Sequence, residues 1–468
     1  MKKIKFIGNS KFINKVKDYL YPSRWSKKKQ IHFIINIAIG LIIAVLMNVL
    51  EHEPVGRTIL NYMVDKLIRK EFSQSSNKIP NNLIFIDIDS QVEDIWNNND
   101  STSSSLMTNR TKLAQLLEAI EQSRPKVIVL DIDFSLRNSQ KGNDDLLIAF
   151  FQNFKTKAIN KQTSTHIVLP VEIKQDNTLR LSFMDSLFKS NPNVCSASAY
   201  VATELNDRTI RYVVDYKITN PNDTIWSVPL AAFALYNDLN KGNFSKERLE
   251  KQLHLNIENE GNEKKFSLNI FASRIRYKLQ PPAISDKEKK ELSGNLNGNN
   301  QQKANIRFSP YEFTGLTEPD DFLSQKQKDS ILSGKIVIIG NSSLAKGDFH
   351  LTPIGEMAGM YVIGNGINTL FMGQINELSV IWVIVIELLI IFFAAYLFLH
   401  LHSTAAEIIG LILMGVPLYF LTIYIFDVKG TVINVIFTML GIAAHRVVSG
   451  LEDMLSAKGR KQHSHNIN

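Results

Sequence analysis

The stretch GKIVIIGNSSLAKGDFHLTPIG, residues 334–355, joins a continuous apolar run to a glycine and a small polar loop. An apolar run of this length between turn residues is typical of a strand that is buried on both faces of a sheet. Asp348 and His350 come after the loop, so ionisable side chains follow the end of the predicted strand. The loop and these two residues could therefore hold a phosphate group, a metal ion or neither.

The spacing of the glycines argues against a phosphate site in this loop. A P-loop has the pattern G-x-x-x-x-G-K followed by Ser or Thr, whereas Gly340 and Gly347 are farther apart and Asp348 follows them. A dinucleotide-binding fingerprint needs a second glycine at the position of Ser342. We therefore expect no nucleotide to bind here.

Strand and helix patterns alternate upstream of this stretch. Continuous apolar runs predict strands over 82–90, 126–135 and 166–173, and helical periodicity predicts helices over 110–123 and 143–154. Such alternation is typical of parallel strands joined by right-handed helical crossovers. The sequence thus predicts an α/β fold with a mixed, largely parallel sheet that has helices on both faces.

The other segments of the same region carry weaker patterns. We expect a strand over 211–218 and helices over 226–239, 320–332 and 359–373. Residues 293–305, SGNLNGNNQQKAN, are rich in Asn, Gly and Gln, and we expect them to be disordered.

Residues 31–50 form an apolar segment without any Lys, Arg, Asp or Glu. At 1.5 Å per residue this segment reaches about 30 Å, which is enough to cross a bilayer. The chain has a net charge of +8, and the basic residues concentrated in 1–30 account for it. A basic tail before an apolar span favours a cytoplasmic N-terminus rather than nucleic-acid binding.

Three more apolar segments follow the predicted domain. They cover residues 379–399, 405–426 and 431–448. The connectors between them are short, so we expect a three-helix transmembrane bundle over 379–450. Four spans in total would place both termini in the cytoplasm, residues 51–378 outside it and residues 451–468 in a short cytoplasmic tail.

Apolar pairs at four-residue spacing over 54–72 predict a stalk helix after the first span. This helix would dock on the domain or pair with a second copy, so a homodimer is one expectation. Cys195 is the only cysteine, and no intrachain disulfide can form. The stability of the region must therefore come from a packed core.

Acidic residues stand at or just beyond the ends of the predicted strands, and they form one candidate site with the loop of the opening stretch. The ionisable members are Asp87, Asp89, Asp131, Asp133, Asp348 and His350. The carboxyl ends of parallel strands meet at one edge of a sheet, where ligands usually bind. The group could hold a divalent metal ion or a small ligand, or the carboxylates could instead cap turns and helix N-termini.

Catalysis is not expected of this chain. We find no nucleophile with a neighbouring base and no metal-hydrolase spacing, and we predict no cofactor apart from the metal ion that could bind. Glu387 lies inside a predicted span, where a carboxylate is costly. It is either a bundle contact that changes with a signal or a neutral side chain bonded to a neighbouring helix.

Several motifs follow one another in a set order along the predicted domain. They are IDIDS with Trp96, Arg110 at the head of a Leu-rich helix, VIVLDIDFS, SVPLAA and GKIVIIGNSSLAKGDFHLTPIGEMAGMYVIGNGINTL. This order resembles the CHASE sensor domain of type two, an extracytoplasmic module of bacterial signalling proteins that lies between one N-terminal span and three C-terminal spans. The family pattern usually has Trp-Pro-x-Arg before the first helix, whereas an insertion separates Trp96 from Arg110 here.

The resemblance implies a multi-pass protein of the bacterial inner membrane whose external domain detects a ligand or a protein. Arg110 and Thr352, which stand in these motifs, are further candidate ligand-binding residues. Family members commonly continue into a cyclase or a kinase, so with a tail of only 451–468 we expect signalling in trans to a separate effector. The alternative is a non-signalling structural or assembly subunit of an envelope membrane complex. The expected partners are the lipid bilayer and that effector or complex subunit, with no nucleic acid.

Overall fold

The computed structural model describes residues 26–74, 82–98, 108–137, 144–173, 179–180, 182–199, 201–203, 208–213, 216–220, 223–238, 273–279, 307–314, 323–342, 348–372, 375–377, 380–400, 411–432, 440–441 and 444. The chain divides into two compact units, one made of Met1–Leu67 with Asn376–Asn468 and the other of Ile68–Ile375. The segment expected to be disordered, 293–305, lies outside the described residues.

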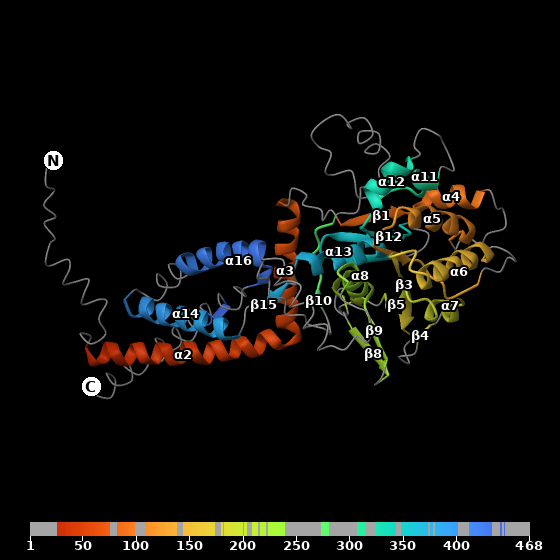
Figure 1. Ribbon diagram of the computed structural model, residues 1–468. Helices are drawn as coiled ribbons and strands as arrows, with labels where there is room; N and C mark the ends of the chain where they lie inside the picture. Colours follow the sequence, from red (N-terminus) through yellow and green to blue (C-terminus); the bar gives the residue numbers. More distant parts are fainter. Residues whose placement is uncertain are drawn as a thin grey trace, which may run out of the picture. The chain divides into compact units, whose positions relative to one another are not determined.

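A seven-stranded sheet forms the centre of the second unit (Figure 1). Its order is β11 (Arg307–Phe308), β1 (Leu83–Asp87), β12 (Ile336–Gly340), β2 (Val127–Asp131), β3 (His166–Ile173) and β4 (Leu179–Arg180), with β5 (Val194–Ser198) also paired to β3. All these pairs are parallel except β3 with β4. The prediction of a mixed, largely parallel sheet is therefore confirmed, and the strand of the opening stretch, β12, lies at its centre.

Both faces of the sheet are covered by helices. On one face, Ile86, Leu130 and Ile339 belong to a core cluster that includes side chains of α5 (Arg110–Gln122) and α6 (Asp145–Ile159). On the opposite face, α8 (Val228–Tyr236) contacts β2 and β3, and α13 (Gly359–Met372) contacts β12. The central strands β1, β12 and β2 are apolar up to their last residues because each of their faces packs against a helical layer.

The helix α13 approaches the sheet very closely at Gly364. A Cβ atom at this position would lie 2.3 Å from Cζ of Phe85, a separation that side-chain atoms do not tolerate. Gly364→Ala is therefore expected to lower the free energy of unfolding by about 1–3 kcal/mol, as overpacked cores do. Urea unfolding followed by tryptophan fluorescence measures this change. The double variant Gly364→Ala/Phe85→Leu should recover part of the loss, and no recovery would contradict this account of the contact.

The predicted helices are present with slightly different bounds. The side chain of Asn109 caps α5 by accepting a hydrogen bond from Lys112 N at 3.1 Å. The hydroxyl of Ser227 caps α8 in the same way, by accepting a hydrogen bond from Leu230 N at 3.3 Å. The helix expected over 320–332 is α12 (Gln325–Leu332). Three shorter helices contribute side chains to the same core cluster as α5 and α6: α4 (Ser90–Asn98), α7 (Asp185–Lys189) and α11 (Pro310–Thr314).

The strand expected over 211–218 is wrong as a single element. Residues of that range belong to β7 (Ile210–Val213), in a sheet of order β10–β7–β6, and to β8 (Tyr216–Asn220), in a hairpin with β9 (Asp223–Trp226). The partners of β7 are β6 (Val201–Thr203) and β10 (Ser273–Arg274), and a separate hairpin joins β13 (Phe349–Thr352) to β14 (Gly355–Ala358).

The first unit holds the long apolar helices. Among the described residues, one helix is long and apolar enough to cross a membrane, over Lys29–Leu50 within α2 (Lys27–His52). Two shorter apolar stretches lie in α14 (Val380–His400) and α16 (Val416–Lys429), which the π-helix η4 (Leu411–Gly415) precedes. A two-stranded parallel sheet pairs β15 (Asn376–Glu377) with β16 (Thr431–Val432).

Within this unit α14 packs along α2, where the rings of Phe33 and Phe392 lie edge to face with centroids 5.4 Å apart. The first of the four expected spans is thus present as a candidate, and the three-helix bundle remains a prediction. The expected stalk is also helical, as α3 (Pro54–Gln74).

Candidate functional site

The candidate site lies at the carboxyl edge of the central strands. Asp87 of β1, Gly340 of β12 and Asp131 of β2 are register partners and form one row across the sheet. Register partners in parallel strands point to the same face, so both carboxyl groups lie on the α13 side. Two strand spacings separate them, about 10 Å. Because Gly340 has no side chain, α13 can approach the sheet between the two carboxyl groups. A Cβ atom on Gly340 would lie only 2.7 Å from Cβ of Met360.

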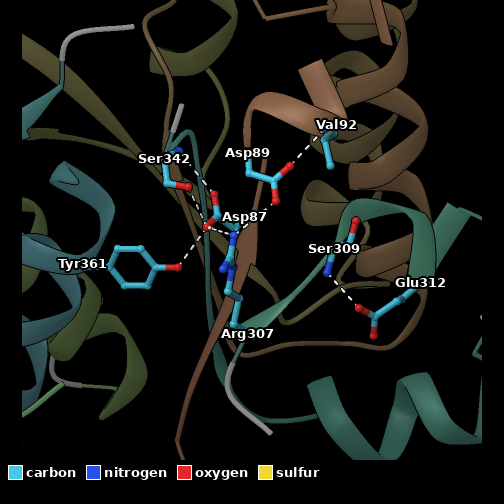
Figure 2. Close-up of polar contacts among 8 residues, drawn as sticks. All are labelled: Asp87, Asp89, Val92, Arg307, Ser309, Glu312, Ser342 and Tyr361. Atoms are coloured by element: carbon cyan, nitrogen blue, oxygen red, sulfur yellow. Dashed lines mark hydrogen bonds and ion pairs between the residues drawn. The ribbon is translucent and has the colours of Figure 1, made fainter. Parts of the chain in front are cut away.

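On one side of Gly340, Asp87 is buried and fully supplied with donors (Figure 2). Its Oδ2 atom lies 2.9 Å from Nη2 of Arg307 and accepts hydrogen bonds from Tyr361 OH at 2.9 Å and Ser342 Oγ at 2.8 Å. Burial raises the pKa of Asp87, whereas Arg307 and the two hydroxyl groups lower it. These four residues, which we call the Asp87 cluster, come from β1, β11, the loop after β12 and α13.

Asp89 extends this cluster towards α4. Its Oδ2 atom lies 3.2 Å from Nη2 of Arg307, and its Oδ1 atom accepts the N–H of Val92 at 3.0 Å in the first turn of α4 (Figure 2). Asp89 therefore does what the capping alternative predicted. One arginine, Arg307, bridges the two carboxylates of IDIDS.

On the other side of Gly340, Asp131 lies near Asp348 and His350, and we call these three residues the Asp131 cluster. His350 Nε2 and Asp348 Oδ1 are 2.8 Å apart. The bond to Asp348 raises the pKa of His350, and burial opposes it. Burial, and to a smaller extent the charge of Asp348, raises the pKa of Asp131 to about 8 against an opposing effect of His350. The Oδ2 atom of Asp131 is buried and has no hydrogen-bond partner.

Arg110 and Asp133 lie together but in neither cluster. The Nη2 atom of Arg110 donates to the main-chain oxygen of Asp133 at 2.6 Å, and the buried guanidinium lies 4.6 Å from the ring centroid of Phe134. Burial lowers the pKa of Arg110, and the charges of Asp144 and Asp133 oppose this. The carboxylate of Asp133 accepts both the N–H and the hydroxyl of Ser135, at 2.7 and 2.8 Å, so it also caps a turn.

Two other predicted residues have local contacts. Thr352 is buried and donates its hydroxyl to Gly355 O at 2.5 Å within the β13–β14 hairpin. Glu387 lies in α14, in the first unit, and its role in switching remains a prediction. Within the described ranges, no three His, Cys, Asp or Glu residues are grouped so as to hold a metal ion. The six ionisable residues expected to converge are thus divided between two clusters and one turn.

Sequence reasoning missed three residues of the Asp87 cluster: Arg307, Ser342 and Tyr361. The last two stand in the opening stretch and its continuation GMYVIGNGINTL, so their nearness to the strand end could have been predicted. Arg307 carries no comparable signal, because it belongs to a two-residue strand whose pairing the sequence pattern does not reveal.

The middle of α13 is bonded to the segment 273–279. Asn365 Oδ1 accepts the N–H groups of Lys278 and Leu279, both at 2.8 Å, and Thr369 Oγ1 accepts the N–H of Arg276 at 2.8 Å. The side chains of Arg276 and Lys278 in turn form ion pairs with Glu71 of α3. The segment therefore connects α13 to α3 through buried polar contacts.

These features define an α/β domain that gathers ionisable side chains under one helix at the carboxyl edge of its sheet, in a chain that also has a candidate membrane span. Residues 38–400 match the model of the CHASE2 domain, and this is more than half of the chain. The chain belongs to the CHASE2 domain family, whose members are extracytoplasmic sensory domains, as the motifs implied. Comparison with curated proteins and with solved structures found no match.

Proposed function

We propose that this chain is a membrane-anchored sensory protein, which detects a ligand or a protein outside the cytoplasm and signals in trans to a separate effector. The observation that carries the proposal is the place of α13. Its first turns lie over the row Asp87, Gly340 and Asp131, and its last residue, Met372, precedes the apolar helix α14 in the chain. A change at the sheet edge therefore acts on the helix that leads to the next apolar segment.

The segment 273–279 supports a second route for the same signal. It is bonded to Asn365 and Thr369 of α13 and to Glu71 of α3, and α3 follows the candidate span of α2 in the chain. A displacement of α13 would thus reach both segments that adjoin apolar helices. Two-state elements that contact both sites are the physical requirement for such coupling.

The alternative, a structural or assembly subunit without a ligand, has one observation in its favour. Asp87 already receives a guanidinium and two hydroxyl donors from its own chain. A site so well supplied needs no external ligand, and its role would then be to hold an interaction surface in shape.

Copurification from the native membrane tests the choice between the two roles. We expect the full-length protein to bring down a protein with a catalytic or regulatory cytoplasmic domain. Recovery of envelope assembly proteins alone would favour the structural role.

Coupling through α13 predicts a specific effect on that partner. Asn365→Ala and Thr369→Val should leave copurification intact but change the partner's activity at least several-fold, because each removes a bond between α13 and residues 273–279. Asn160→Ala, at the exposed end of α6, is the matched control and should change nothing. If all three variants support the same activity, this route of coupling is wrong.

A further inference from the structure

The Asp131 cluster and the Asp87 cluster occupy equivalent places on the two sides of Gly340, but their aspartates differ in hydrogen-bond partners. Both aspartates flank Gly340 in the same row and face the same helix. Asp87 has Arg307, Tyr361 and Ser342 as partners, whereas the buried Oδ2 atom of Asp131 has none. Asp131 is half-buried, but its Oδ2 atom is shut off from water, and a carboxylate oxygen in that position without a partner favours a proton or a nearby cation.

A proton fits the surroundings of Asp131 better than a larger cation does. A metal ion would need several ligands, and the described residues offer no group of three that could hold one. An organic cation would need room beside Oδ2, yet less than 1 Å² of this atom is exposed. A proton needs no room, and burial together with the charge of Asp348 favours the protonated carboxyl, with a pKa of about 8.

The described elements around Asp131 are the neighbouring strands β12 and β3, the helices α8 and α13, and β13. Gly340 of β12 and Met360 of α13 carry no charge, and α8 has no charged residue. The β13 strand and the residue before it contribute His350 and Asp348. Protonation of Asp131 therefore depends on the charge of this bonded pair.

The same pair touches the first residue of α13. Gly359 N donates to the main-chain oxygen of Asp348 at 3.0 Å. The carboxylate of Asp348 lies so close to Gly359 that a Cβ atom there would be 2.1 Å from Oδ2. A change in the charge of Asp131 moves Asp348 by repulsion, and Asp348 cannot move without affecting the start of α13.

We propose that Asp131, Asp348 and His350 form a proton-binding site, and that its occupancy sets the packing of the first turn of α13. In acid the Asp131 carboxyl is neutral and a cationic His350 pairs with Asp348. In alkali two carboxylates face each other beside a neutral imidazole, and the cluster loosens. That the protein senses external acidity rests on the proposed sensory function, whereas proton binding by these three residues does not depend on it.

The sign of the pH dependence follows from the two shifts. The pKa of Asp131 is higher in the folded protein than its ordinary 3.8, so the folded state loses stability as the pH rises from about 4 to about 8. The pKa of His350 is also raised, and the stability that this contributes below its ordinary 6.5 is lost as the pH rises through the folded value. Both groups make the protein less stable in alkali.

Unfolding of the full-length protein in detergent, measured from pH 5 to pH 9, tests the site. One extra proton bound by the folded state changes the equilibrium constant of unfolding about 10-fold per pH unit. Between pH 5 and pH 7 this constant should therefore rise about 100-fold more in the wild type than in Asp131→Asn. Asp94→Asn, an exposed aspartate in α4, is the control and should follow the wild type. The protection of the first-turn amides of α13 against hydrogen exchange, relative to the intrinsic exchange rate at each pH, should fall above pH 8 in the wild type and not in Asp131→Asn.

A second variant keeps the test decisive if Asp131→Asn does not fold. Asp348→Asn removes the charge that raises the Asp131 pKa, so the midpoint of the pH dependence should move to lower pH. The proposal is overturned if both variants keep the wild-type pH dependence, or if Mg²⁺, Ca²⁺ or Zn²⁺ stabilises the wild type but not Asp131→Asn, since a metal ion would then be the occupant. These measurements need no effector, so their failure leaves the sensory proposal intact, and failure to find an effector leaves the proton site intact.

Discussion

Replacing Arg307 with methionine is expected to lower the free energy of unfolding by about 3 kcal/mol at neutral pH. The substitution leaves Asp87, with only 1% of its surface exposed, without the cation that lies 2.9 Å away. The Arg307 side chain is 21% exposed, which keeps the effect near the lower end of the range for broken buried ion pairs. Urea unfolding of the detergent-solubilised full-length protein, followed through the buried Trp96 and Trp226, measures the loss.

The pH dependence of this loss separates charge from packing. Removal of Arg307 removes a group that lowers the pKa of Asp87, so the carboxyl becomes still easier to protonate in the folded state. The loss should therefore be small near pH 4 and should grow as the pH rises. The double variant Arg307→Met/Asp87→Asn should recover much of the stability, and Arg137→Met, an exposed arginine, should change little. An equal loss at pH 4 and pH 8 would indicate lost packing rather than a stranded charge.

Replacing Glu71 with leucine is expected to cost about 3–5 kcal/mol, the largest effect of any single change proposed for this protein. Glu71 is 6% exposed and neutralises two cations, Arg276, which is 4% exposed, and Lys278, whose Nζ atom lies 2.6 Å away. Without Glu71 both cations remain close to the core without a counter-charge. The same denaturation experiment measures the loss.

A double-mutant cycle distinguishes the ion pair from the general loss of a buried side chain. Glu71→Leu/Arg276→Met should be more stable than Glu71→Leu alone, because two apolar side chains can replace a buried ion pair at little net cost. Glu71→Gln keeps the shape and a hydrogen-bond acceptor, so it should lose less than Glu71→Leu. Additive losses in the double variant would show that the pair contributes no coupling energy.

Much of the sheet could be predicted from the sequence because its strands are buried on both faces. The runs around β1, β2, β3 and β12 are apolar without interruption, and such runs have few alternatives in a chain that alternates with helices. The range 211–218 failed for a related reason. Its apolar and β-branched residues suit one strand as well as two short strands, and the partners decide between them: β7 pairs with β6 and β10, and β8 pairs with β9.

The candidate site was predicted as one group and is in fact divided. The sequence places Asp87 and Asp131 at strand ends, but it does not show that β12 separates the two strands or that Gly340 lies between the two carboxyl groups. Nor does it show Arg307, which reaches Asp87 from a chain position more than two hundred residues away. Register and long-range pairing, rather than residue type, determine which charges meet.

The central place of β12 bears on how the chain folds during synthesis. The strands β1 and β2 flank β12 and hydrogen-bond to it rather than to each other, so neither has its inner neighbour until residues 336–340 have been made. Until then two apolar strand edges are unpaired, and such edges are prone to aggregate. Non-local pairing of this kind also slows folding. Ribosome-bound chains that end before residue 336 should therefore depend on chaperones, and protease resistance of the sheet should arise abruptly once β12 is complete.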